Sequence, residues 1–588
     1  MDHVGGHVGA LLEGRRRSCV VDGLAPDEYA GPVAEGASLQ SRIVGGELGG
    51  RRSGSSQNQQ RDDQVGSHGR GANASDPAGN RTHPMLEATE PRRISVMRRV
   101  TKALWVLALC TELASVSAQG GHEGPAGGEG WSRFRGPNGH GVSSSTGLPV
   151  TFGEKENVVW RAAVPMGHSS PVVFGDAVYL TAAEGEKLLT IRLDRATGKE
   201  VWRAVSPRTR TTKVDGRNGP ASPTAAVDRD VVVVFFPDFG MVAYGHDGKE
   251  RWRLALGPFD NLYGMGASPV IHDGRVFLPC DQNRNSYLLA VDKATGKELW
   301  RVKRPWAKSG HCTPIFWTPK EGETQLVLPG SFYLDGYDPK TGERIWWVSG
   351  LSFEMKSTPV LHEGIVYING YGSPLNNVGN QIVMPTFEES LRTQDANKDG
   401  FISKPEMPAT RATGWFGFVD LDGDKKLGKA EWRYLRDALA SKNGTLAIRA
   451  GGKGDMTEKN VIWTYHRSIP QLPSPLLYGG VLYMLNDQSG FITLLDPKTG
   501  KVIERGRLKE ASDDYYASPV AADGKIYFVG LSGLITVLKK GGQLEPVAKV
   551  SKIGEGCYST PAIVGNRIFI RTNDTLFCFG KKEGPGGR

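Results

Sequence analysis

The stretch that decides the fold is LDRATGKEVW, residues 193–202, because close copies of it recur further along the chain. The other copies are VDKATGKELW (291–300), YDPKTGERIW (337–346) and LDPKTGKVIE (495–504). Each copy ends an apolar strand, turns through Thr-Gly and enters a second strand, usually with tryptophan. Glycine supplies the positive φ that such a tight turn requires. The stretch is therefore one hairpin of a repeated antiparallel unit.

A Ser-Pro or Thr-Pro pair marks the start of each unit. The prolines are Pro171, Pro223, Pro269, Pro314, Pro359, Pro475, Pro519 and Pro561. Neighbouring prolines are 42 to 52 residues apart, except for one step of 116 residues. Behind each pair come a short strand, a Gly/Asp turn and a second strand, as in GDAVYL and DGRVFL. Eight copies of a four-stranded unit predict an all-β fold, an eight-bladed β-propeller.

The two ends of the repeat region complement each other. NVVWRAAV (157–164) has the pattern of a fourth strand, whereas the last unit, from Pro561 to Phe579, has three strands and no fourth. We expect the N-terminal strand to complete the last blade and close the ring, which hides both sheet edges. A linear solenoid would not explain these ends. Tryptophans at one position of the unit are expected to pack between blades: Trp202, Trp252, Trp300 and Trp346.

These repeats resemble the PQQ-like β-propellers, a family of quinoprotein alcohol dehydrogenases and BamB-type assembly lipoproteins. The resemblance spans roughly Trp131 to Phe579 outside the long step, and WSRFRGPNGHGVS (131–143) resembles the start of exported bacterial members. It implies the propeller fold. It does not imply an activity, because the family includes both enzymes and scaffolds without a cofactor.

The front of the chain has a different composition. Residues 1–96 are rich in Gly, Arg, Ser and Gln, so we expect a disordered leader. A basic start, an apolar run and small residues then predict a signal peptide at residues 97–118. We interpret Met97 as the true initiator and residues 1–96 as a mis-assigned start; a genuine long leader is the alternative. The chain is thus expected to be secreted, periplasmic in a bacterium, without a transmembrane segment.

The remaining composition excludes some classes of partner and site. The formal charge is +9 and its residues are scattered, which does not favour a nucleic-acid-binding stripe. Four cysteines follow the signal peptide: Cys280, Cys312, Cys557 and Cys578. Their spacing matches no metal motif, and buried free thiols are the simplest interpretation, although export would permit disulfides.

The long step contains DANKDGFISKPE (395–406), which fits the ligand pattern of an EF-hand calcium loop. The expected ligands are Asp395, Asn397, Asp399, Phe401 through its carbonyl, Ser403 and Glu406. DLDGDKKLGKAE (420–431) is a second such loop. Its expected ligands are Asp420, Asp422, Asp424, Lys426 through its carbonyl and Glu431. Lys425 stands where glycine is expected, so we predict a weaker second site.

The loops are expected to lie in a small helical insert, residues 373–444, between propeller segments 119–372 and 445–582. Ile402 and Leu427 should pair between the loops. The insert follows EGIVYINGYG, a second strand, so it should stand at the rim of the channel mouth; a position on the outer rim is the alternative.

Residues just before the Ser/Thr-Pro pairs differ from unit to unit, as positions in a binding site on a rigid scaffold would. These candidate mouth residues are His168, Arg217, Tyr263, His311, Glu354, Lys356, Tyr515, Tyr516 and Tyr558. Neutral drift would also produce such variation.

No catalytic motif accompanies the repeats. Quinoproteins of the resembled family hold PQQ with an adjacent-cysteine disulfide, and no Cys-Cys pair occurs here. We therefore expect a calcium-binding, non-catalytic binding or scaffold protein whose mouth takes a protein or a glycan. PQQ is possible as a cofactor but not expected. The alternatives are a PQQ- and calcium-dependent dehydrogenase of alcohols or sugars, and a glycan-binding propeller.

Overall fold

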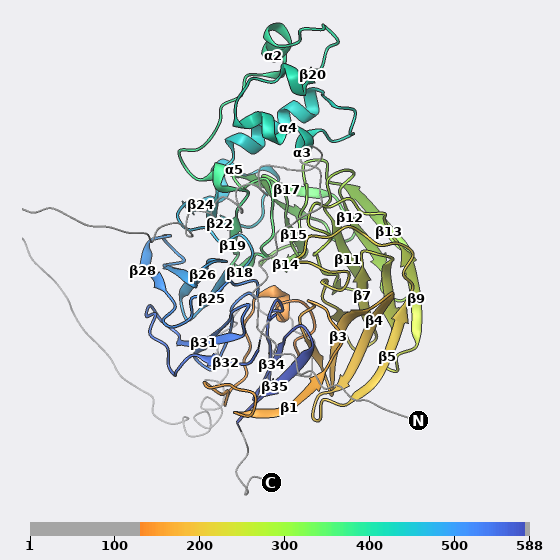
Figure 1. The fold of residues 1–588 in the computed structure, drawn as a ribbon, viewed down its shortest axis with the longest axis vertical. Helices are drawn as coiled ribbons and strands as arrows, with labels where there is room; N and C mark the ends of the chain where they lie inside the picture. Colours follow the sequence, from red (N-terminus) through yellow and green to blue (C-terminus); the bar gives the residue numbers. More distant parts are fainter. Residues whose placement is uncertain (1–129, 555, 582–588) are drawn as a thin grey trace, which may run out of the picture. The chain divides into compact units, whose positions relative to one another are not determined.

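The strands form eight antiparallel sheets arranged in a ring, as the repeats predict, and the centre of this ring is called the central channel below (Figure 1). The computed structural model describes residues 130–554 and 556–581, and the expected leader and signal peptide lie outside this range. The first strands of neighbouring blades contact one another around the channel, for example β2 with β6, β25 with β29, and β33 with β2. The contact of β33 with β2 closes the ring.

The first four blades follow one another without interruption. Blade 1 contains β2 (Val172–Phe174), β3 (Ala177–Glu184), β4 (Lys187–Asp194) and β5 (Glu200–Ser206). Blade 2 contains β6 (Ala226–Val227), β7 (Val232–Phe236), β8 (Gly240–Tyr244) and β9 (Glu250–Ala255). Blade 3 contains β10 (Val270–His272), β11 (Arg275–Cys280), β12 (Tyr287–Asp292) and β13 (Glu298–Lys303). Blade 4 contains β14 (Ile315–Trp317), β15 (Gln325–Pro329), β16 (Tyr333–Tyr337) and β17 (Arg344–Ser349), with β23 (Gly454–Asp455) added parallel to β17.

The last four blades contain the insert and the closure. Blade 5 contains β18 (Val360–His362), β19 (Ile365–Gly370), β22 (Gly444–Arg449) and β24 (Val461–Tyr465), which follows α5 (Thr457–Asn460). Blade 6 contains β25 (Leu476–Tyr478), β26 (Val481–Leu485), β27 (Phe491–Leu495) and β28 (Val502–Arg507). Blade 7 contains β29 (Val520–Ala522), β30 (Lys525–Val529), β31 (Leu534–Lys539) and β32 (Ser551–Lys552). Blade 8 contains β33 (Ala562–Val564), β34 (Arg567–Arg571) and β35 (Thr575–Phe579), and β1 (Val158–Ala163) completes it beside β35.

Tryptophans join neighbouring blades, and the Thr-Gly turns make this possible. Trp252 Nε1 on β9 donates to the Lys293 carbonyl in the turn of blade 3 at 2.8 Å. A Cβ on Gly296 of that turn would come within 2.5 Å of the indole, and Gly296 has φ +71°. Glycine is therefore required both for the turn and for the ring packed on it. Trp160, Trp202, Trp300 and Trp463 make the same contact.

Trp346 departs from this pattern in its hydrogen bond, although it is fully buried in an apolar core that also contains residues of blade 5. Its Nε1 donates to Gln325 Oε1 at 2.6 Å within its own blade, and its indole lies over Gly336. The reason is that blade 5 has no Thr-Gly turn at this point. Its third and fourth strands are joined by a longer segment that carries β23 and α5.

The Ser/Thr-Pro pairs form a belt of hydrogen bonds around the channel. The backbone N–H of one blade donates to the hydroxyl of the next at every junction except that between blades 4 and 5, among the described residues. The bonds are Ser170 to Thr224, Thr224 to Ser268, Ser268 to Thr313, Thr358 to Ser474, Ser474 to Ser518, Ser518 to Thr560 and Thr560 to Ser170, at 2.9–3.2 Å. The repeat marker in the sequence is thus a set of blade-to-blade contacts.

The insert leaves blade 5 between its second and third strands, β19 and β22. It contains η2 (Pro374–Asn376), α2 (Phe387–Thr393), β20 (Ile402–Ser403), η3 (Lys404–Glu406), η4 (Arg411–Trp415), α3 (Phe416–Val419), β21 (Lys426–Leu427) and α4 (Lys429–Ala440). β20 and β21 pair antiparallel, with Ile402 opposite Leu427 as predicted, and both side chains are buried. This short antiparallel pairing joins the two loops to each other.

Candidate functional site

The first loop of the insert winds around the carboxylate of Asp395. Asp395 accepts the N–H of Asp399 at 3.2 Å and that of Gly400 at 3.0 Å, and Asn397 Oδ1 accepts the N–H of Asp399 at 2.9 Å. Gly400 has φ +81°, the left-handed geometry of the sharp turn. Glu406 reaches back to the start of the loop and accepts the N–H of Ala396 at 3.0 Å. The predicted ligand positions thus lie on one tight turn.

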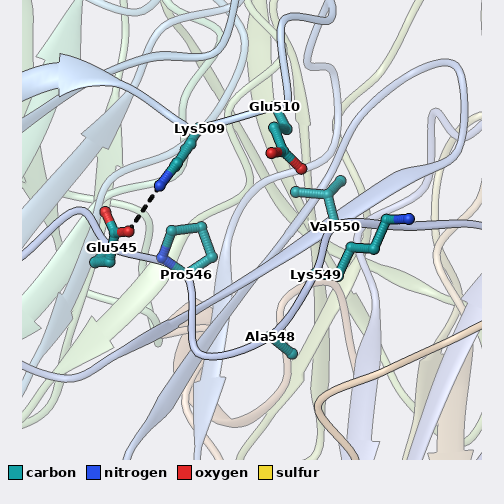
Figure 2. A pocket seen from close by; sticks show the side chains of 7 residues that line it. All are labelled: Lys509, Glu510, Glu545, Pro546, Ala548, Lys549 and Val550. Atoms are coloured by element: carbon teal, nitrogen blue, oxygen red, sulfur yellow. Dashed lines mark hydrogen bonds and ion pairs between the residues drawn. The ribbon is translucent and has the colours of Figure 1, made fainter.

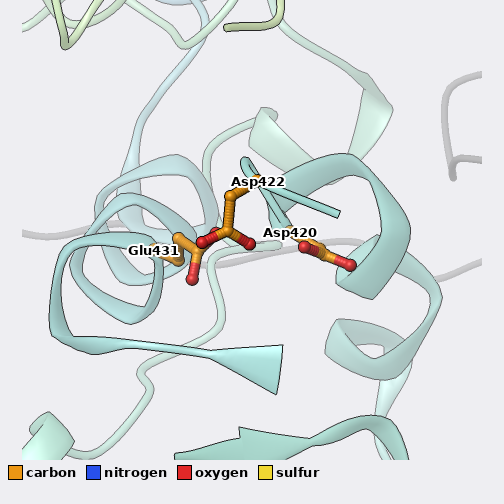
Figure 3. A group of neighbouring side chains, drawn as sticks. All are labelled: Asp420, Asp422 and Glu431. Carbon is orange, nitrogen blue, oxygen red and sulfur yellow. The ribbon is translucent and has the colours of Figure 1, made fainter. Parts of the chain in front are cut away.

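The second loop brings three carboxylates together (Figure 3). Single oxygens of Asp420, Asp422 and Glu431 all lie within 4.8 Å of one another. Glu431 is only 8% exposed and accepts N–H bonds from Leu421 at 2.6 Å and Gly428 at 2.8 Å. Burial raises the pKa of Glu431, and the charges of Asp422 and Asp420 raise it further. Carboxylates gathered in this way favour a cation, and oxygen ligands at this spacing suit calcium.

Two lysines distinguish the loops. Lys425 has φ +66° at the position that Gly400 occupies in the first loop, so a side chain stands where the backbone favours glycine. Lys426 extends across the β20–β21 pair, and its Nζ lies 2.7 Å from Asp399 Oδ2 of the first loop. This ion pair lowers the pKa of Asp399 and engages one of the predicted first-loop ligands.

An apolar core fixes the insert to the propeller. Phe353, in the β17–β18 loop, is fully buried with its ring centroid 4.7 Å from that of Trp415 and 5.5 Å from that of Phe418. Phe332, in the β15–β16 loop, packs against Tyr434 of α4 at 5.2 Å. These two propeller residues share one core with the helices of the insert. The insert therefore stands on the loop face that carries the predicted mouth residues.

A buried lysine supports the same junction. Lys308, from the β13–β14 loop, is 2% exposed, and its Nζ donates to the Phe418 carbonyl at 2.7 Å. The ammonium lies 4.8 Å from the ring centres of both Phe418 and Tyr434. Burial lowers the pKa of Lys308 to about 7, and the charge of Glu431 opposes that fall. The sequence analysis missed Lys308 and Phe353, because neither lies in a motif and both depend on long-range contacts.

The structure brings several predicted mouth residues of different blades into one row. The His168 ring stacks on that of Tyr558 with centroids 4.1 Å apart, and Tyr558 meets Tyr516 edge-on at 5.0 Å. Burial raises the pKa of Tyr516, and the Arg217 guanidinium opposes this rise. Arg217 also lies over the ring of Tyr263 at 5.8 Å. Mouth residues of five different blades are thus connected to one another by successive side-chain interactions, and we call them the mouth row.

The row continues to a buried ion pair before blade 5. Lys356 Nζ lies 5.0 Å from the Tyr263 ring centre and 2.7 Å from Glu354 Oε2. Glu354 is fully buried, and its Oε1 has no hydrogen-bond partner among the described residues. Burial and the Lys356 charge lower the pKa of His311 to about 3. Arg217 pairs with Asp215 at 2.6 Å, so both mouth cations are matched by carboxylates of their own loops.

Tyr515 does not belong to this row, which corrects its prediction as a mouth residue. It is fully buried in the core between blades 6 and 7, and its hydroxyl donates to the Ala511 carbonyl at 2.8 Å. The two adjacent tyrosines point to different environments, and only Tyr516 faces the mouth row. The four cysteines are free and buried, as the simplest interpretation held: Cys280, Cys312, Cys557 and Cys578.

Two surface pockets are lined by residues other than those of the mouth row. One of about 320 Å³ is lined by Lys509, Glu510, Glu545, Pro546, Ala548, Lys549 and Val550 (Figure 2). Lys509 and Glu545 pair across it at 2.9 Å. The other, of about 570 Å³, is lined by Glu154, Arg161, Ala163, Ile553, Gly554, Thr572, Asn573, Asp574, Thr575 and Phe577. Neither contains a predicted site residue.

In the part of the chain that the structure describes, no helix has both the length and the apolar composition needed to cross a bilayer.

Comparison with known proteins identifies a quinoprotein relative over a short segment. Quinohemoprotein alcohol dehydrogenase ADH IIB of Pseudomonas putida is 34% identical over 108 residues, which are 16% of this chain and 14% of that enzyme. The match therefore covers a small part of either protein.

The longer matches are to assembly factors. Outer membrane protein assembly factor BamB of Burkholderia pseudomallei (strain K96243) is 23% identical over 391 residues, 64% of this chain and 86% of that protein. The crystal structure of BamB from Moraxella catarrhalis is similar with a TM-score of 0.46 and 11% identity, over 72% of this chain and 99% of that one. The family model described as outer membrane protein assembly factor BamB matches residues 142–284, 189–375 and 424–585. Because this family model matches more than half of the chain, the protein belongs to this family of PQQ-like propellers.

Proposed function

We propose that this protein is an exported, calcium-binding propeller that acts as a non-catalytic scaffold for another protein. The family described as an outer membrane protein assembly factor supports a scaffold role, since the matches cover most of the repeat region. The signal peptide expected at residues 97–118 supports export. On this proposal the protein works at a bacterial envelope.

The observation that carries the proposal is the fixed position of the insert. Phe353 and Phe332 join its helices to the propeller in one apolar core, so the two calcium loops are presented on a rigid support. The two mouth cations, Arg217 and Lys356, are matched by their own carboxylates. The mouth row would therefore present aromatic and neutral polar groups to a partner protein. The insert would present a protein surface raised above the propeller.

Calcium would be held by the two loops. The first would use Asp395, Asn397, Asp399, the Phe401 carbonyl, Ser403 and Glu406. The second would use Asp420, Asp422, Asp424, the Lys426 carbonyl and Glu431. The ion would neutralise the gathered carboxylates and lock each loop between its helices, so its role is structural.

The calcium part is tested by titration calorimetry and limited proteolysis of the full chain. We expect calcium to bind and to slow cleavage within residues 385–445, and we expect Asp395→Ala and Asp420→Ala each to reduce both effects. Asp437→Ala is the matched control, because Asp437 lies on α4 outside the loops. Equal proteolysis with and without calcium would contradict a structural ion.

The non-catalytic part is tested with excess PQQ and calcium. We expect no stoichiometric retention of PQQ after gel filtration and no dye-linked oxidation of a panel of alcohols and sugars. Retention with turnover would establish the quinoprotein alternative and place its active site at the mouth. The four buried free cysteines do not supply the adjacent pair that the resemblance to quinoproteins would require.

A further inference from the structure

The segment that precedes β1, residues 131–143, runs through the central channel. Trp131 exchanges two backbone hydrogen bonds with β2 at 2.8 and 3.0 Å. The side-chain amide of Asn138 donates to the Phe316 carbonyl of β14 at 2.7 Å and accepts the Phe316 N–H at 2.8 Å. The Ser143 N–H donates to a carbonyl of β29 at 2.9 Å. These are first strands of blades 1, 4 and 7. Its single turn, η1 (Pro137–Gly139), lies in the middle of the ring of blades (Figure 1).

Two arginines of this segment are buried in the channel. Arg135 is fully buried, and Arg133 is 7% exposed. Arg135 Nη2 donates to the Pro475 carbonyl at 2.8 Å and reaches the His140 carbonyl at 3.4 Å, while Arg133 Nη2 donates to the Pro314 carbonyl. Burial lowers the pKa of both guanidinium groups to about 9, so both stay charged at neutral pH.

Neither arginine has a carboxylate partner within residues 130–554 and 556–581. Arg304 is a contrasting case in the same fold: it is fully buried, but it pairs with Asp281 at 2.9 Å and with Asp335 at 3.0 Å. A buried guanidinium remains protonated and is costly to leave without a counter-charge. The channel therefore contains two buried positive charges that the described protein groups do not neutralise.

The unpaired hydrogen-bonding groups around the segment are mostly donors. Buried atoms without a partner among the described residues include Arg135 Nε and Nη1, Arg133 Nε and Trp131 Nε1. Each of these can only donate. Thr358 Oγ1 is also unpaired, at the one junction where the hydroxyl belt is interrupted. A Cβ on Gly139 of η1 would come within 3.1 Å of Thr358 Cγ2, so this side chain borders the segment. The described protein groups around this segment therefore supply too few hydrogen-bond acceptors and too little negative charge for its donors.

We propose that the central channel binds a small inorganic anion, of the size of chloride or phosphate, at the guanidinium of Arg135. The free Nη1 donors would bind the ion, and Arg133 would add a second positive charge on the same turn. The ion would supply the acceptors and the counter-charge, and so fix the N-terminal segment inside the ring. This site is independent of the calcium loops and of any partner.

The first test is thermal unfolding of the full chain at constant ionic strength. The reference anion is gluconate, a bulky organic carboxylate, and chloride, bromide or phosphate replaces it in the other samples. Because a ligand that binds only the folded state stabilises it, we expect a saturable rise in the unfolding midpoint with each small anion. The ion that saturates at the lowest concentration identifies the ligand. Arg135→Gln should remove the dependence, whereas Arg229→Gln, at a side chain that is 88% exposed, should keep it.

The second test is a crystal grown in bromide. We expect an anomalous peak in contact with Arg135 Nη1. Absence of that peak, or equal midpoints in gluconate and in all three small anions, would overturn the proposal. If Arg135→Gln does not fold, the bromide crystal of the unaltered protein decides alone.

Discussion

Truncating Phe353 should release the insert while the propeller stays folded. Phe353 is fully buried between the propeller loop and the rings of Trp415 and Phe418. Replacing a buried phenylalanine by alanine costs about 3–5 kcal/mol. We expect this free-energy loss to weaken the docking of the insert on the propeller and not to unfold the whole protein, because α4 has further contacts within the insert.

The assay is hydrogen exchange followed by mass spectrometry. Since 1.36 kcal/mol corresponds to a factor of ten, a docking loss of about 3 kcal/mol should speed exchange in α4 by about 100-fold. Exchange in β30 of blade 7 should not change. Val383→Ala is the matched control, because Val383 lies in the insert with 92% of its surface exposed. Unchanged exchange in α4, or equal acceleration in β30, would refute the reasoning.

Three further substitutions test single contacts. Lys426→Gln should tighten calcium binding by the first loop, measured by calorimetry, because it frees the Asp399 carboxylate. Lys429→Gln is the control and should not tighten binding, because Lys429 pairs with Glu388, which lies outside the loops. Lys425→Gly should raise the unfolding free energy of the insert by about 1 kcal/mol, because glycine adopts the left-handed backbone without strain. Lys425→Ala should give no such gain, because alanine keeps a Cβ at φ +66°. Gly296→Ala should lower the urea midpoint more than Gly274→Ala, since both have positive φ but only Gly296 lies against an indole.

Residues close together in the sequence predicted most of the repeat architecture. The spacing of the Ser/Thr-Pro pairs predicted the number of blades, and the unmatched strand around Trp160 predicted the closure on β35. The EF-hand pattern of the two loops also predicted the pairing of Ile402 with Leu427. These features follow from strand periodicity and turn chemistry, which act over a few residues.

Long-range contacts decided the rest. Tyr515 and Tyr516 are adjacent in the loop before β29, yet Tyr515 packs into the core of blades 6 and 7 whereas Tyr516 contacts Tyr558 in the mouth row. Lys426 reaches the first loop only because β20 and β21 pair.

Within the described chain, sequence alone predicted the units, their order and the pairing of Ile402 with Leu427 between the two insert loops. Only the tertiary structure placed Arg135 in the channel and Phe353 under the insert. The physical reason is that burial and charge pairing depend on which blades meet, and residues hundreds of positions apart meet only when the ring closes.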